Sequence, residues 1–378
     1  MSLQQQGDNQ SWINEVWDKL QIKIFAETKR MGEKIPYIPV NGVYPDQGKS
    51  DIYWWTNGFW GGILWQMYYA TKNDVYRETA ERLEARLDQA LDGYDGLHHD
   101  VGFMWLHTAV ANYRLTGNER SKTRGLHAAN LLSGRYNPRG KFIRAWNDDC
   151  TGWTIVDCMM NIPLLYWASG VTDDPRFTFI AKDHADTTLE KTVRSDGSCN
   201  HIVILDPENG DFVEAPGGQG FESGSSWSRG QSWALYGFAL SYHYTKDERY
   251  LSVAKRIAHY FIANVSGTDF VPLVDFRAPF EPICWDTTAG VCAACGMLEI
   301  ADSVGEHEKS LYRNAAINIL KATDRRFCNW NIEEDSIVGG GSVAFHGRNG
   351  DLDVPIIYGD YFFIEAILRL RGQSFLVW

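Results

Sequence analysis

G-W-T-I-V-D-C-M-M-N-I-P-L-L-Y-W-A, residues 152–168, is a stretch of apolar and aromatic residues with one acidic side chain, Asp157. Pro163 favours a helix start close by, so Asp157 could cap that helix. Alternatively, an apolar wall would disfavour its charge and raise its pKa, which suits a general acid. This stretch alone leaves both interpretations open. Its apolar character on every side, however, predicts a helix that is buried all round.

Apolar helices of this kind recur along the chain. Each of the first five is followed by a short polar turn and an amphipathic helix, and the sixth closes the chain; the units begin near residues 56, 98, 153, 227, 285 and 358. Helices that are apolar all round belong inside a ring of amphipathic ones. We therefore predict an all-α fold, an (α/α)6 barrel of six helical hairpins, rather than an open solenoid, which would need polar caps.

The barrel is expected to form a single domain over residues 1–378. Residues 11–29 read as a further amphipathic helix, and residues 1–10 are expected to be disordered or an artificial leader. No membrane span or signal-peptide segment is visible, which leaves the compartment open: cytoplasmic, or periplasmic if a leader has been removed. Cys292 and Cys295 form a C-x-x-C in an apolar helical pattern, so we expect buried thiols rather than a redox or zinc site.

The polar residues fall at one end of the apolar helices. Four units align on Thr71, Thr116, Thr172 and Thr245, and counting back about fifteen positions reaches Trp55–Thr56, Asp100, Asp157 and Arg229. The matching zones of the last two units are Asp286–Thr288 and Tyr358–Asp360. Capping explains each acid alone, but not Arg229, because a helix N-terminus disfavours a cation. The repeat therefore predicts one concave site at this end of the barrel.

Composition narrows the chemistry of that site. The net charge of −12 makes nucleic acid and anionic membranes poor partners. The chain has 15 Trp, 18 Tyr and 18 Phe; filling a large core explains most of them, but rings beyond that need often line sugar-binding sites. There is no serine-nucleophile, P-loop or dinucleotide motif. His98-His99-Asp100 resembles a metal site, but adjacent histidines on a helix point about 100° apart, so we predict no metal. Two carboxylates among aromatic rings, Arg and His favour acid/base catalysis on a sugar.

Long segments of the chain resemble the unsaturated glucuronyl hydrolases of glycoside hydrolase family 88. The resemblance rests on H-H-D-V-G-F (98–103), I-V-D-C-M-M-N-I-P-L-L-Y-W-A (155–168) and G-S-S-W-S-R-G-Q-S-W-A-L-Y-G-F (224–238). N-G-F-W-G-G-I-L-W near the start and Y-G-D-Y-F-F-I-E-A near the end extend it, in order, over about residues 50–370. It implies an (α/α)6 barrel.

The resemblance also implies the reaction. The family removes the 4,5-unsaturated uronic acid that polysaccharide lyases leave at the non-reducing end of glycosaminoglycan fragments of the chondroitin, hyaluronan or heparin type. Asp157 matches the aspartate that protonates C4 of the enol ether and helps water add at C5, after which the hemiketal opens and releases the partner sugar. Asp100 matches the second essential carboxylate, which we expect to grip sugar hydroxyls and to tune Asp157 by like-charge repulsion. No cofactor is implied, since the reaction needs only water and a carboxyl group.

Substrate-binding positions follow from the same motifs: Trp60, Trp146, His201, Gln219, Trp227, Arg229, Trp233 and Tyr358. Arg229 is the candidate partner of the uronate carboxylate, because a guanidinium binds a carboxylate at two points. In residues 339–355, His346 and Arg348 could bind a sulfate, although a solvated loop is the simpler interpretation. Three other functions stay open: an unsaturated rhamnogalacturonyl hydrolase acting on pectin fragments, a conventional inverting glycosidase, and a non-catalytic helical-repeat protein that binds carbohydrate.

Overall fold

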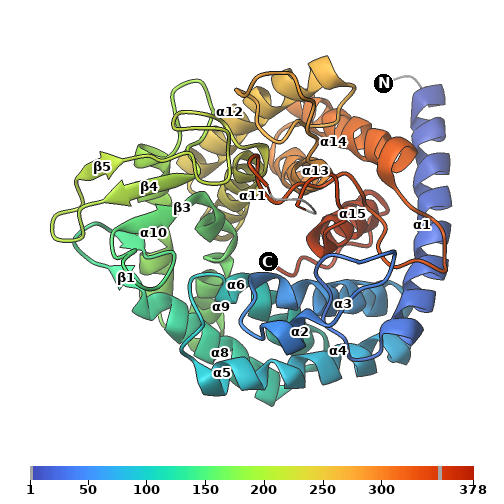
Figure 1. The fold of residues 1–378 in the computed structure, drawn as a ribbon, viewed down its shortest axis with the longest axis horizontal. Helices are drawn as coiled ribbons and strands as arrows, with labels where there is room; N and C mark the ends of the chain where they lie inside the picture. Colours follow the sequence, from blue (N-terminus) through green and yellow to red (C-terminus); the bar gives the residue numbers. More distant parts are fainter. Residues whose placement is uncertain (1–2, 348–350) are drawn as a thin grey trace.

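The computed structural model describes residues 3–347 and 351–378, and its helices form the predicted barrel of paired inner and outer helices (Figure 1). The inner helices are α3 (Phe59–Thr71), α6 (Val101–Trp105) continued by η2 (Leu106–Val110) and α7 (Ala111–Thr116), α9 (Pro163–Thr172), α11 (Ser228–Thr245), α13 (Thr287–Ser303) and α15 (Ile357–Leu370). The outer helices are α4 (Asp74–Arg86), α8 (Glu119–Gly134), α10 (Arg176–Lys191), α12 (Glu248–Val265), α14 (Glu306–Phe327) and α1 (Leu3–Met31).

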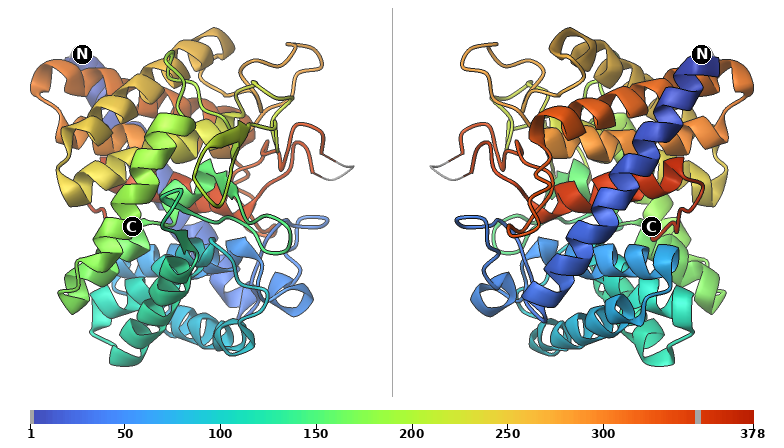
Figure 2. Two further views of the ribbon diagram at one scale, coloured as in Figure 1. Left: turned by 90° about the vertical axis from the view of Figure 1, so that its left-hand side faces the viewer. Right: turned by 90° about the vertical axis from the view of Figure 1, so that its right-hand side faces the viewer.

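Helix α1 is the outer helix that the sixth unit lacks in sequence order. It contacts both α15 and α4, and α3 contacts α15, so the first and last hairpins join and the ring closes. Figure 2 shows α1 running diagonally across the outside of the barrel. Residues 3–10, which we expected to be disordered, belong to this helix. Its start is held against α14, where the Asn9 side chain accepts a hydrogen bond from Lys321 Nζ at 2.5 Å.

Short turns join inner to outer helices at one end of the barrel. In four hairpins, a threonine hydroxyl donates to the carbonyl four residues earlier (Thr71, Thr116, Thr172 and Thr245). The next residue has a left-handed backbone (Lys72, Gly117, Asp173 and Lys246), and the one after it accepts an N–H from the first turn of the outer helix (Asn73, Asn118, Asp174 and Asp247). Each turn thus ends one helix and caps the next within three residues.

Long segments connect the hairpins at the opposite end, where the inner helices begin. They contain the short helices α2 (Gln47–Ser50), α5 (Asp88–Gly93), η1 (Trp55–Gly58) and η4 (Ser266–Thr268), and two small antiparallel sheets. One sheet pairs β1 (Tyr136–Asn137) with β2 (Phe142–Ile143), and the other has the order β3 (Trp153–Ile155), β4 (Ile202–Leu205), β5 (Phe212–Glu214). Sequence analysis did not anticipate these strands.

The larger sheet positions two of the candidate site residues. Ile155 lies opposite Ile202, and the Val156 N–H donates to the His201 carbonyl at 3.0 Å. The chain then enters the 3-10 turn η3 (Val156–Met160), which carries Asp157, and continues into α9. The sheet therefore brings Asp157 beside His201, although 44 positions separate them in sequence.

The interior of the barrel is filled by aromatic and aliphatic side chains of the inner helices. Cys292 and Cys295 of α13 are buried and not in disulfides, as predicted. None of the helices within residues 3–347 and 351–378 combines the length and the apolar character that crossing a membrane requires.

Candidate active site

A cavity of about 260 Å³ opens where the inner helices begin, as the repeat predicted. Its walls combine two carboxylates, an arginine, a histidine and a set of aromatic rings. The lining residues are Tyr37, Trp54, Trp55, His98, Asp100, Trp146, Ile155, Asp157, Gln219, Trp227, Arg229, Val343 and Tyr358.

Asp157 lies in this cavity and does not cap a helix. The caps of η3 and α9 are Ile155 and Ile162, and the Asp157 side chain accepts from neither helix. The residue is only 9% exposed, and its Oδ1 lies 3.4 Å from Nε2 of His201. The capping interpretation is therefore wrong.

His201 is held in one tautomer. Its Nδ1 accepts the backbone N–H of Gln219 at 3.0 Å, so the proton of the neutral ring is on Nε2, the nitrogen that faces Asp157. This contact depends on Gly218, whose φ is +61° and where a Cβ would lie 2.1 Å from His201 Nδ1. The glycine-rich loop thus serves the site by letting its backbone approach the histidine.

Asp100 lies at the start of α6 and is 8% exposed. Burial and the charge of Asp157 raise the pKa of Asp100 well above its ordinary value, while the hydrogen bond from Asn161 opposes the shift. The charge of Asp157 therefore acts on Asp100. The raised pKa on Asp100 means that it keeps a proton at pH values where an ordinary aspartate is ionised.

Asn161 joins the elements that carry the two acids, and sequence analysis missed it. Its Nδ2 donates to Asp100 Oδ1 at 3.1 Å and to the Asp157 carbonyl at 3.3 Å, and its Oδ1 accepts the Phe103 N–H at 2.8 Å. The sequence did contain a signal for this residue: Asn161 lies four residues after Asp157 and is the only amide side chain in the apolar stretch 152–168.

Arg229 lines the cavity but is already paired. Its Nη1 lies 2.7 Å from Asp286 Oδ2, and its Nη2 donates to the Val343 carbonyl at 2.5 Å. Asp286 also caps α13 through the Thr288 N–H. The buried Nε–H of Arg229 has no protein partner among the described residues, so one edge of the guanidinium keeps free donors.

The aromatic candidates occupy different depths. Trp146, Trp227 and Tyr358 line the cavity, and Trp146 is half-buried, as a stacking platform requires. Trp233 lies beneath them, fully buried, with its ring centroid 6.2 Å from that of Tyr358. Gln219 also lines the cavity, and its Nε2 donates to the Val343 carbonyl at 2.6 Å.

Trp60 is not at the cavity. It is the second residue of α3, is 1% exposed, and is not among the lining residues. The rings that the first unit contributes are instead Trp54 and Trp55, which precede the helix at its mouth. Tyr37, from the Pro/Gly-rich loop after α1, is a further lining residue that sequence analysis missed.

The segment that follows α14 covers one side of the cavity. The Phe345 N–H donates to the Gln219 carbonyl at 2.8 Å, and His346 Nε2 lies 2.7 Å from the Phe221 carbonyl. His346 is exposed and ties two loops together, whereas Arg348 lies outside the described residues.

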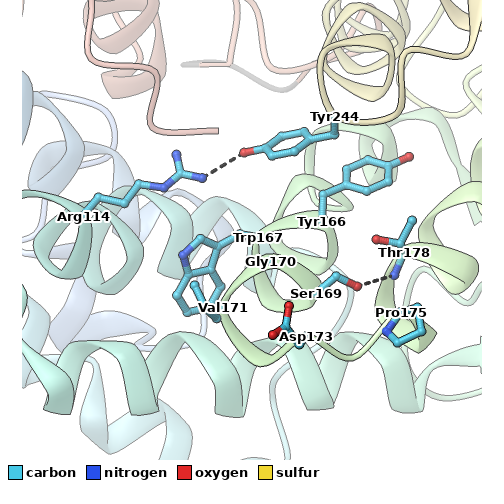
Figure 3. Close-up of a pocket in the computed structure, with 10 residues that line it drawn as sticks. All are labelled: Arg114, Tyr166, Trp167, Ser169, Gly170, Val171, Asp173, Pro175, Thr178 and Tyr244. Atoms are coloured by element: carbon cyan, nitrogen blue, oxygen red, sulfur yellow. Dashed lines mark hydrogen bonds between the residues drawn. The ribbon is translucent and has the colours of Figure 1, made fainter.

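A larger cavity, of about 680 Å³, lies at the opposite end of α9 (Figure 3). Tyr166, Trp167 and Tyr244 line it, and Arg114 in its wall donates to the Tyr244 hydroxyl at 2.9 Å. Among the described residues that line it, the one carboxylate is Asp173, which is exposed. Size alone therefore does not select the candidate active site, because the buried ionisable groups converge in the smaller cavity.

Comparisons with known proteins identify the family of the chain. The family model of Glycosyl Hydrolase Family 88 matches residues 29–244. An unsaturated glucuronyl hydrolase of Bacillus sp. (strain GL1) is 36% identical over 375 residues, which cover 96% of this chain and 98% of that protein. An unsaturated chondroitin disaccharide hydrolase of Streptococcus pneumoniae (strain ATCC BAA-255 / R6) is 31% identical over 353 residues, covering 89% and 86%. A solved structure of a UGL variant with dGlcA-Glc-Rha-Glc superimposes with a TM-score of 0.89 at 35% identity, covering 95% of this chain and 97% of that one.

Proposed function

The chain belongs to Glycosyl Hydrolase Family 88, and on that premise we propose that Asp157 and Asp100 carry its reaction. It is a glycosidase that removes the 4,5-unsaturated glucuronic acid from the non-reducing end of glycosaminoglycan oligosaccharides. The observation that supports this site most directly is the pairing of two nearly buried carboxyl groups in a narrow cavity with aromatic walls.

Asp157 is the general acid of the proposed mechanism. It gives a proton to C4 of the enol ether, and a water molecule adds at C5 and returns a proton to Asp157. The product is a hemiketal, whose opening releases the partner sugar. His201 Nε2–H, 3.4 Å from Asp157 Oδ1, steadies the carboxylate that forms between the two proton transfers.

Asp100 binds the sugar rather than attacking it. With its raised pKa it is neutral when an ordinary aspartate is charged, so it can both donate to and accept from a sugar hydroxyl. A neutral Asp100 also removes one negative charge that would repel the uronate. Asn161 fixes its orientation, and we assign Asn161 the role of a positioning residue.

The uronate carboxylate is placed against Arg229. Asp286 and two backbone carbonyls already accept hydrogen bonds from the Arg229 guanidinium. The uronate carboxylate can therefore bind only the edge formed by Nε–H and the remaining N–H of Nη2. Asp286 also offsets the charge of Arg229, so recognition depends on directed hydrogen bonds more than on a positive field. Trp146 and Trp227 provide flat surfaces for the sugar ring, with Trp233 supporting the floor beneath them.

The size of the cavity supports cleavage at a chain end. At about 260 Å³ it is below the roughly 300–1,000 Å³ of pockets that enclose whole drug-sized ligands. We therefore expect one sugar ring to be enclosed and the partner sugar to lie at the mouth, beside Val343 and Trp146.

The test is the ultraviolet absorbance of the C4–C5 double bond. An unsaturated chondroitin or hyaluronan disaccharide should lose absorbance with the protein, whereas the saturated disaccharide should stay intact. If the glycosaminoglycan disaccharides are inert while unsaturated pectin fragments react, the substrate class is wrong. Cleavage of the saturated disaccharide would instead rule out the hydration mechanism.

A further inference from the structure

Three potential metal ligands converge at one side of the cavity: His98, His99 and Asp100. Nδ1 of His98 and Nε2 of His99 each lie 3.4 Å from Oδ2 of Asp100, and one ligand atom from each of the three residues lies within 4.8 Å of the others. The Asp100 N–H donates to His98 Nδ1 at a long 3.5 Å, a contact that a metal ion would replace. Within the described part of the chain, no other group of three or more His, Cys, Asp or Glu side chains is placed to hold a metal ion.

Two of the separations match those of a tetrahedral zinc site. Zinc lies about 2.0–2.2 Å from nitrogen and oxygen ligands, which places neighbouring ligand atoms about 3.3–3.6 Å apart in a tetrahedral site. The 3.4 Å contacts lie within this range and are long for hydrogen bonds. The separation of the two histidine nitrogens has to shorten, which the partly exposed His98 ring can achieve.

His99 is a buried polar group that lacks a partner. It is fully buried, and neither of its ring nitrogens has a hydrogen-bond partner among the described residues. Such a group costs free energy unless something binds it.

The helical objection raised from the sequence does not hold. His98 and His99 precede α6, which begins at Val101, and their rings stack with centroids 5.5 Å apart and an interplanar angle of 29°. In this turn the two side chains point to the same side, so the angular argument against a shared ligand fails.

We propose that His98, His99 and Asp100 form a binding site for a zinc-like divalent transition-metal ion. His98 and Asp100 line the cavity, so the fourth ligand position faces it and takes a water molecule or a sugar hydroxyl. The metal displaces the proton that Asp100 otherwise holds and occupies its carboxylate, so it competes with the sugar and inhibits the hydrolase; only this consequence rests on the proposed function. Asp157 adds a nearby negative charge, while Arg135 opposes the cation.

Binding is tested without reference to activity. Chelator-treated protein is titrated with Co²⁺, whose tetrahedral complexes absorb strongly in the visible range, and with Zn²⁺ by calorimetry. We expect one site, and a loss of affinity of about 100-fold or more in both Asp100→Asn and His99→Gln. His127→Asn, at an exposed histidine of α8, is the matched control and should bind as the parent does.

Equal affinity in the parent and both site variants would overturn the proposal, as would a thiolate-to-cobalt charge-transfer band, which would place the ion at a cysteine. Two variants are used because a fold defect in one would not explain a shared loss. For inhibition, Zn²⁺ should raise KM for the unsaturated disaccharide, and chelator should reverse the effect. Binding at this site with unchanged KM and kcat would refute the inhibition, whereas an enzyme that is inactive in chelator without metal would instead refute the proposed function.

Discussion

The two ends of the barrel are formed by the same helices yet differ in almost every other respect. Where the inner helices end, three-residue turns satisfy the helix termini locally, and the large cavity there lies beside an exposed Asp173. Where they begin, long segments bring distant strands, glycines and buried acids together around a smaller cavity. The difference supports the proposal that the chemistry takes place at the end whose polar groups are brought together by tertiary contacts. A substitution at one end can therefore be compared with a matched substitution at the other.

The largest effect is expected for the acids themselves. Asp157→Asn should lower kcat/KM by about 10²–10⁴-fold, because the amide cannot donate the proton to C4. Asp173→Asn, at the opposite end and in a left-handed conformation that Asn tolerates, should leave kcat/KM unchanged. Steady-state rates on an unsaturated disaccharide measure both. Similar losses in the two variants would show that the contrast between the ends is false.

The next effect concerns the glycine loop. Gly218→Ala should lower kcat/KM by about 10–100-fold, because the new Cβ would lie 2.1 Å from His201 Nδ1 and displace the ring that faces Asp157. Gly224→Ala is the control: its φ of +79° imposes similar backbone strain, but nothing lies within 4 Å of its Cβ. The Tm should fall in both variants, and further in Gly218→Ala because of the added clash, while only Gly218→Ala loses activity. An equal loss of activity would mean that strain, and not the His201 contact, is responsible.

A smaller effect is expected in how the free energy of unfolding depends on pH. Burial raises the pKa of Asp360 on α15 to about 7, although its carboxylate accepts the Ile337 and Val338 N–H groups. The unfolded carboxyl titrates near 3.9, so the folded state holds the proton more tightly. This contribution to the free energy of unfolding is full below about pH 4 and is lost as pH rises to about 7, by at most about 1.4 kcal/mol per pH unit.

Urea unfolding between pH 4 and 8 measures this dependence. Asp360→Asn should be less stable than the parent at low pH. As pH rises, however, its free energy of unfolding should fall less steeply than that of the parent, by up to about 1.4 kcal/mol per pH unit. Asp173→Asn should keep the parental slope. An unchanged slope in Asp360→Asn would assign the dependence to other buried acids.

Local sequence patterns predicted the helical barrel. Apolar helices, polar turns and the spacing from each turn threonine to Asp100, Asp157 and Arg229 depend on neighbours within a few turns of chain, so they can be read from sequence. The positions of Trp60 and the His98-His99 pair were misjudged for the opposite reason. Each lies within three residues of a helix start, where an error of one or two positions turns a side chain to another face.

Long-range contacts explain the rest of what the sequence did not reveal. Helix α1 closes the ring against α15 across more than 300 positions, and Arg229 pairs with Asp286 across 57. Strands of two to four residues, such as β3 and β4, are too short to show an alternating pattern, yet they decide that His201 faces Asp157. The sequence therefore predicted at which end the cavity with Asp100, Asp157 and Arg229 lies, but not how its charges are paired.

The smallest predicted effect tests the far cavity. Gly170, in α9, lines that cavity, and a Cβ added there would have nothing within 4 Å, so Gly170→Ala should raise the free energy of unfolding by about 0.5–1 kcal/mol through helix propensity. Its kcat/KM should equal that of the parent, because the site lies at the other end of the same helix. Gly102→Ala is the counterpart near Asp100, where a Cβ would lie 2.4 Å from Asn161 Cα, and it should lose both stability and activity. A loss of activity in Gly170→Ala would mean that the two ends communicate through α9, and the division drawn between them would have to be abandoned.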